Sequence, residues 1–113
     1  MGFFRKEVID FALDHQTRQA MEEQQASIAA DPSNPRPYYQ LALLYGMQYK
    51  PDDALGLLLE SVRLDPTFAP AHVALAEIYA VRNDLPAARR HAGLAAAQGD
   101  SRAKEMLERY GEA

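Results

Sequence analysis

The chain has 113 residues, of which 48% are hydrophobic and 25% are charged, and these are the proportions of an ordinary soluble domain rather than of a disordered tail. Its formal net charge is −4 and its pI is near 5.3, whereas nucleic-acid-binding proteins usually carry a basic excess. This length suits one domain with its own core, and we expect no nucleic-acid partner.

Signals for disulfides, secretion and membrane insertion are absent from the sequence. The chain has no cysteine, which excludes disulfides, thiolate metal sites and a cysteine nucleophile. Charges at Arg5, Lys6, Glu7 and Asp10 interrupt the first residues, so these lack the apolar stretch of a secretory signal. No run of about 18 apolar residues occurs either. We therefore expect a cytoplasmic protein with no membrane contact.

The first thirty residues predict one or two helices. An apolar stripe that starts at Phe4 meets His15 and further polar residues at the same helical spacing, so the helix face changes character midway. We predict two helices, at 3–14 and 18–30, with a turn at 14–17. No Gly or Pro enforces that break, and the alternative is one continuous helix whose first half reaches for another molecule.

The central residues predict a helical hairpin. Apolar residues at helical spacing indicate helices at 36–48 and 53–64, and the polar residues between them indicate a turn. Pro35 suits the opening of the first helix, because the first residue of a helix needs no N–H donor. Asp65-Pro66 ends the second helix.

Similar punctuation follows towards the C-terminus. Asn83-Asp84 predicts a turn, a helix at 85–98 follows, and Gly99 suits the left-handed position that ends it. A last helix at 102–110 has one apolar and one charged face, so we expect it to cap the open apolar side of the preceding hairpin.

These landmarks recur at an interval of 34 residues. Asp31-Pro32 and Asp65-Pro66 are separated by this interval, and several small and aromatic residues repeat in the same register. The repeated sets are Ala20, Ala54 and Ala88; Leu41 and Leu75; Ala42 and Ala76; and Tyr45 and Tyr79.

The clearest unit resembles the tetratricopeptide repeat, a helical hairpin of 34 residues. Its motif reads Tyr38-x-x-Leu41-Ala42-x-x-Tyr45 and continues with Ala54, Leu58, Ser61 and Pro66. The unit at 69–102 is similar, but His72 replaces the usual bulky residue, and the unit at 1–34 is degenerate. The resemblance implies an all-α superhelix of helical hairpins: one domain over 1–113, with units at 1–34, 35–68 and 69–102 and a capping helix at 101–111.

The resemblance also implies a binding site, because the first helix of each hairpin lines a concave groove in that family. The family's groove positions fall here on Arg5, Ile9, Arg36, Tyr39, Leu43, Met47, Val73, Glu77 and Val81. This lining is mostly apolar, and exposed apolar strips mark contact surfaces. The lysine and asparagine clamp of the members that bind chaperone tails is missing. We expect an amphipathic or apolar peptide, with the charged residues as selectors, unless the chain's own elements or a second copy cover the strip.

No catalytic or metal-binding set is visible in the sequence. His15, His72 and His91 lie in unrelated registers without a ligand partner at i+4, so we interpret them as solvated or partly packed. No serine has an elbow motif and no glycine-rich phosphate loop occurs. We therefore expect no enzyme activity, no cofactor and no metal. The predicted function is protein binding by a scaffold module, and the alternative is self-association through the groove and the Phe3-Phe4 segment, which would give a homo-oligomer.

Overall fold

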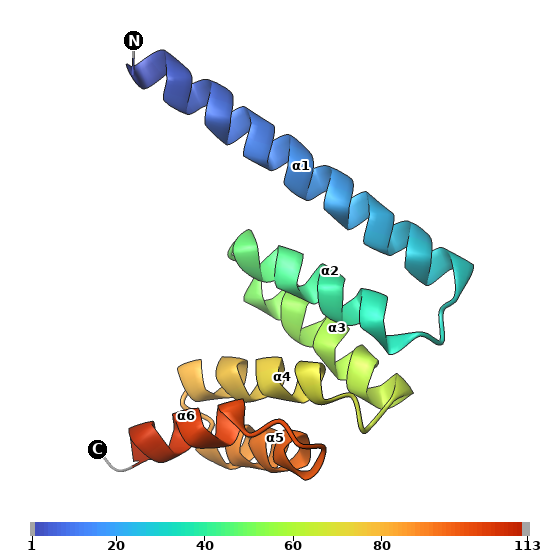
Figure 1. Ribbon diagram of the computed structural model, residues 1–113, viewed down its shortest axis with the longest axis vertical. Helices are drawn as coiled ribbons and strands as arrows, with labels where there is room; N and C mark the ends of the chain where they lie inside the picture. Colours follow the sequence, from blue (N-terminus) through green and yellow to red (C-terminus); the bar gives the residue numbers. More distant parts are fainter. Residues whose placement is uncertain (1, 112–113) are drawn as a thin grey trace.

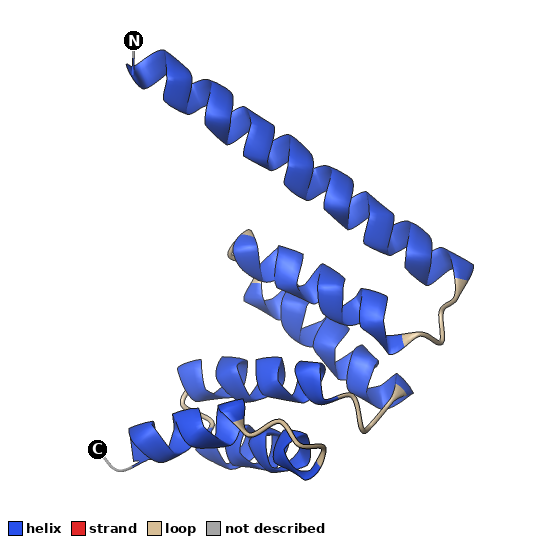
Figure 2. Ribbon diagram, viewed as in Figure 1, coloured by secondary structure: helices blue, strands red, loops and turns tan. Residues whose placement is uncertain are grey.

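The computed structural model describes the backbone of residues 2–111 and the side chains of residues 14–109. Six α-helices follow one another, and the described residues contain no strand (Figures 1 and 2). They are α1 (Gly2–Ala30), α2 (Pro35–Met47), α3 (Pro51–Leu64), α4 (Ala69–Val81), α5 (Leu85–Ala97) and α6 (Arg102–Gly111). The predicted all-α fold is confirmed.

The helices form a row in which chain neighbours pack together. Helices α2 and α3 make one hairpin, α4 and α5 make a second, and α6 packs on both α4 and α5, while α1 packs on α2 (Figure 1). The Cα radius of gyration is 16.3 Å. A compact chain of this length would have a radius of about 13 Å, so the row is elongated.

Helix α1 is continuous, so the prediction of two helices with a turn at 14–17 is wrong and the alternative of one helix is correct. Residues 14–17 contain neither Gly nor Pro, and a change in the apolar pattern does not by itself end a helix. Only one stripe of its described part is half-buried, and this stripe has the helical spacing of a face that packs on α2. The stripe consists of Thr17, Ala20, Met21, Gln24 and Ile28.

Residues 2–30 consequently form no hairpin, because the chain continues α1 where a first helix would turn back. Ser27 and Ser61 are separated by one repeat interval and show the effect. Ser61 is fully buried and its hydroxyl donates to the Pro35 carbonyl of α2 at 3.0 Å. Ser27 is exposed, and its hydroxyl donates to the Glu23 carbonyl of its own helix at 3.1 Å.

The ends of three helices share one backbone device. Tyr49, Asn83 and Gly99 have φ values of 59°, 61° and 93°, which are in the left-handed region. After each of them, the next amide N–H bonds back to a carbonyl five residues earlier, at 3.0, 2.8 and 3.0 Å, in the Schellman arrangement. The role predicted for Gly99 is confirmed.

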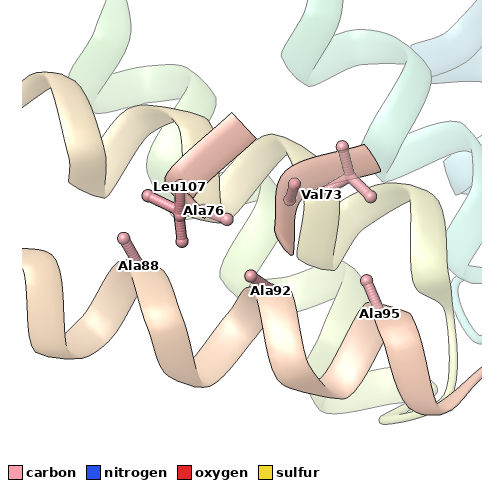
Figure 3. Packing of buried hydrophobic residues seen from close by; sticks show 7 residues of the cluster. Val73, Ala76, Ala88, Ala92, Ala95 and Leu107 are labelled. Atoms are coloured by element: carbon pink, nitrogen blue, oxygen red, sulfur yellow. The ribbon is translucent and has the colours of Figure 1, made fainter. Parts of the chain in front are cut away.

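Two buried clusters form the core. The first joins α2, α3 and α4 and contains Ala42, Ala54, Leu58, Ala71 and Leu75. The second joins α4, α5 and α6 and contains Val73, Ala76, Ala88, Ala92, Ala95, Ala103 and Leu107 (Figure 3). Small residues at these crossings allow the helix backbones to approach closely. Helix α6 covers the second hairpin through Ala103 and Leu107, which are both buried.

Candidate peptide-binding face

Helix α2 presents an apolar stripe at a spacing of four residues. Leu43 is 42% exposed and Met47 is 68% exposed, and Tyr39 lies one turn before them, half-buried. The Tyr39 ring packs edge-on against Phe68, with ring centroids 5.7 Å apart. The guanidinium of Arg36 lies 5.6 Å from the centroid of the same Phe68 ring, within cation–π range. The stripe therefore has a fixed aromatic end and an open aliphatic end.

Helix α4 contributes a more polar stripe at the equivalent positions. Glu77 is exposed and Val81 is 88% exposed, as expected of groove residues. Val73 is only 5% exposed, because it packs in the core cluster with Ala103 and Leu107 of α6. The assignment of Val73 to an open groove is therefore wrong: the chain's own capping helix covers it.

Arg102, at the start of α6, forms an ion pair with Asp100. Its guanidinium donates to the Asp100 carboxylate at 2.9 and 2.7 Å, and these hydrogen bonds are the main reason why the pKa of Arg102 is raised. Tyr39 and Glu77 add smaller electrostatic contributions in the same direction. Helix α6 packs on α4 and α5, and this ion pair stands at its first residue.

The structure leaves six of the nine predicted groove residues exposed or half-buried. They are Arg36, Tyr39, Leu43, Met47, Glu77 and Val81, and we call them the α2–α4 face. The side chains of Arg5 and Ile9 lie outside the described residues, and only the helical backbone of α1 is described there.

An open pocket of about 540 Å³ adjoins the far end of the stripe. Asp14 and Thr17 of α1 line one side, and residues 47–50 line the other, so Met47 belongs both to the pocket and to the α2–α4 face. Sequence reasoning missed this pocket because we predicted a turn at 14–17, and the pocket wall requires an uninterrupted α1.

The structure also brings His72 of α4 and His91 of α5 together inside the second hairpin. Their Nδ1 atoms are 3.0 Å apart, and their exposed fractions are 3% and 5%. The Tyr79 ring stacks on His91 with centroids 5.6 Å apart. The interpretation of these two histidines as solvated or partly packed is wrong, whereas His15 is exposed as expected. A signal was available, since His72 and His91 stand one interval after Tyr38 and Leu57.

Burial disfavours a charge on His91. The pKa of His91 is lowered from 6.5 to about 4, first by burial and then by the positive charges of His72 and Arg90. Within the described side chains, no group of three or more His, Cys, Asp or Glu could hold a metal ion, and every buried polar side-chain atom has a hydrogen-bond partner. The pair therefore joins α4 to α5 through buried side chains whose polar atoms all have hydrogen-bond partners.

Comparisons with known proteins agree with this geometry. A family model described as "Tetratricopeptide repeat" matches residues 14–92. The crystal structure of MamA has the same fold, with a TM-score of 0.68 and 22% sequence identity over 84% of this chain and 55% of that one. The chain thus spans about half the length of the MamA structure. No curated protein matches the sequence. None of the described helices has both the length and the apolar character that crossing a membrane requires.

Proposed function

Because the chain belongs to the tetratricopeptide repeat family, whose repeats generally mediate protein–protein interactions, we propose that it binds an apolar or amphipathic peptide segment on the α2–α4 face. Members of this family typically act as non-enzymatic scaffolds. The observation that carries the proposal is the run of Tyr39, Leu43 and Met47 on successive turns of α2, with the last two open to solvent.

The chemistry of the face favours an amphipathic ligand. Apolar side chains of a bound helix would pack on Leu43 and Met47, and the pocket beside Met47 offers room for one large side chain. Arg36 precedes Tyr39 by about one turn on α2, and Glu77 precedes Val81 by about one turn on α4. A ligand with an acidic residue near one end and a basic residue near its middle would match these charges.

The face can be tested by selecting peptides from a random library on the wild-type protein and measuring their binding to variants. We expect Leu43→Glu to weaken binding at least about tenfold, because a carboxylate would be buried against apolar side chains. Glu77 already occupies the equivalent position of α4, so the substitution should leave the helical circular dichroism and the melting temperature nearly unchanged.

A matched control is Leu59→Glu on α3. Leu59 is 40% exposed, almost the same as Leu43, but it lies on the second helix of the hairpin. Binding that survives Leu43→Glu, or that falls equally in the two variants, would move the site away from the α2–α4 face.

Self-association is the second candidate, and the length of α1 favours it. Helix α1 has 29 residues and α2 has 13, which correspond to about 43 Å and about 20 Å. The N-terminal half of α1 continues past the end of α2 (Figure 1). Light scattering of the full chain and of a chain that begins at Arg18 would test this. A dimer that becomes a monomer on truncation supports the idea, and a monomer in both cases removes it.

A further inference from the structure

A chain of hydrogen bonds passes through the buried histidine pair, and the partners at its two ends determine its direction. The Pro66 carbonyl can only accept, so His72 Nε2, at 2.7 Å from it, carries a hydrogen. In a neutral ring His72 Nδ1 is then an acceptor, and His91 Nδ1 must donate to it across 3.0 Å. His91 Nε2 is left as an acceptor and faces the guanidinium of Arg90 at 3.5 Å, which can only donate. We assign these tautomers from the partners.

This series of hydrogen bonds connects three segments of the protein. Pro66 belongs to the loop between α3 and α4, His72 to α4 and His91 to α5. In the first hairpin, the Tyr38 hydroxyl donates to the Pro32 carbonyl at 2.9 Å, as His72 does to the Pro66 carbonyl. Leu57 occupies the position of His91, so the second hydrogen bond has no counterpart there. The second hairpin is therefore linked by ionisable groups where the first is linked by a phenol and an aliphatic side chain.

We propose that the His72–His91 pair is a proton-sensitive link, which holds α5 and the α3–α4 loop on α4 at neutral pH and loosens the second hairpin on acidification. One added proton forces His91 to carry its hydrogen on Nε2, against the Arg90 guanidinium. With a second added proton, the Nδ1 atoms of both rings carry a hydrogen, although at 3.0 Å one of them has to accept a hydrogen bond from the other. Neither state is readily accommodated in a buried site.

The neighbouring charged groups act on the two rings in opposite directions, because Asp65 attracts a charge on His72 whereas Arg90 repels one on His91. The titratable and charged groups that face it are Asp65 from the α3–α4 loop, Tyr79 from α4 and Arg90 from α5. The Asp65 carboxylate accepts from the amide and the hydroxyl of Thr67 at 2.9 and 2.6 Å, which is the main reason why its pKa is lowered. Arg90 adds a positive charge that opposes protonation of His91.

The sign of the pH dependence follows from the lowered pKa of His91. His91 takes up a proton near pH 6.5 in the unfolded chain but only near pH 4 in the folded chain. The stability is therefore fully present above pH 6.5 and is lost progressively as the pH falls towards 4. The carboxyl groups with lowered pKa are Glu60, with an ordinary value of 4.5, and Asp65 and Asp100, with 3.8, so they change stability only below about pH 5.

The test compares melting temperatures, followed by circular dichroism, between about pH 7.5 and about pH 5, above the range in which carboxyl groups titrate. We expect the wild-type protein to lose about 5 °C or more over this interval. The double variant His72→Tyr with His91→Leu copies Tyr38 and Leu57 of the first hairpin, and it should lose less than half as much. His15→Gln, which removes the exposed imidazole, should behave like the wild type. Equal losses in the wild type and the double variant would overturn the proposal.

A second measurement on the wild-type protein does not depend on whether the double variant folds. At neutral pH, the ring nitrogen chemical shifts in nuclear magnetic resonance should place the hydrogen of His72 on Nε2 and that of His91 on Nδ1. The His91 ring should remain neutral at about pH 6, where a free histidine is mostly charged. A charged His91 at that pH, or a hydrogen on its Nε2, would contradict the proposal.

Discussion

The two hairpins have nearly the same helix lengths and the same left-handed turn after their first helix, but their interiors differ. The first hairpin is filled by Leu57 and Leu58 and has a buried hydroxyl at Ser61. At the equivalent positions, the second hairpin has His91, Ala92 and Ala95. Leucine side chains thus fill the first hairpin, whereas buried alanines and a stack of His72, His91 and Tyr79 fill the second.

This difference shows which features the repeat requires. Ala54 and Ala88 are both buried at the helix crossings, and Tyr49 and Asn83 have the same left-handed backbone, one interval apart. Backbone turns and small crossing residues are thus retained, while the side chains between them vary. The next three predictions change one position of a matched pair and use the other hairpin as the reference, in order of decreasing effect.

The largest effect is expected for Leu58→Ala, which places in the first hairpin the residue that the second has as Ala92. Leu58 is 1% exposed, and the surrounding helices cannot close the cavity completely. We expect a loss of about 2–5 kcal/mol in the free energy of unfolding. Urea denaturation measures it, with the exposed neighbour Leu59→Ala as a control that should cost far less. A loss below that of the control would mean that the first hairpin tolerates the alanine interior of the second.

A smaller effect is expected for Ser61→Ala, which copies Ala95. The variant loses the buried hydrogen bond from the hydroxyl to the Pro35 carbonyl, and we expect a cost of about 1 kcal/mol. Ser27→Ala is the matched control, because Ser27 occupies the same repeat position but bonds only to its own helix. Equal melting temperatures for the two variants would show that the α2–α3 bond does not contribute to stability.

The smallest effect is a gain, expected for Tyr49→Asn, which copies Asn83. Tyr49 has φ 59° and is 92% exposed, so it loses little packing on substitution, and Asn adopts the left-handed region more readily. We expect a stabilisation of up to about 1 kcal/mol, measured by thermal melting. The reverse change, Asn83→Tyr, should destabilise the second hairpin, and a shift of both variants in the same direction would contradict this explanation.

The sequence allowed most of the fold to be predicted, because the punctuation is local. The helices at 36–48, 53–64, 85–98 and 102–110 are present with ends shifted by one or two residues, and α3 starts earlier because Pro51 opens it. The predicted turn at 14–17 is absent, because a change in the apolar pattern does not break a helix as Gly or Pro would. A missing partner helix changes what a face packs against but does not interrupt the backbone hydrogen bonds.

The candidate site was less accessible to sequence reasoning, because burial depends on which helix covers which. Val73 has the register of a groove residue, but α6 folds over it. His72 and His91 are 19 positions apart on different helices, so no spacing rule within one helix could pair them. The repeat interval did contain a signal for their burial, because Tyr38 and Leu57, 34 residues before the two histidines, are both half-buried.

The order of packing along the row has a consequence for how the chain folds. Apart from the contact between α4 and α6, the main helix contacts join segments that are consecutive in sequence. Each hairpin can therefore form before distant parts of the chain meet, and chains with such local contacts fold quickly for their size. The same locality divides the stability among neighbouring units, so the ends of the row can open while the centre remains folded.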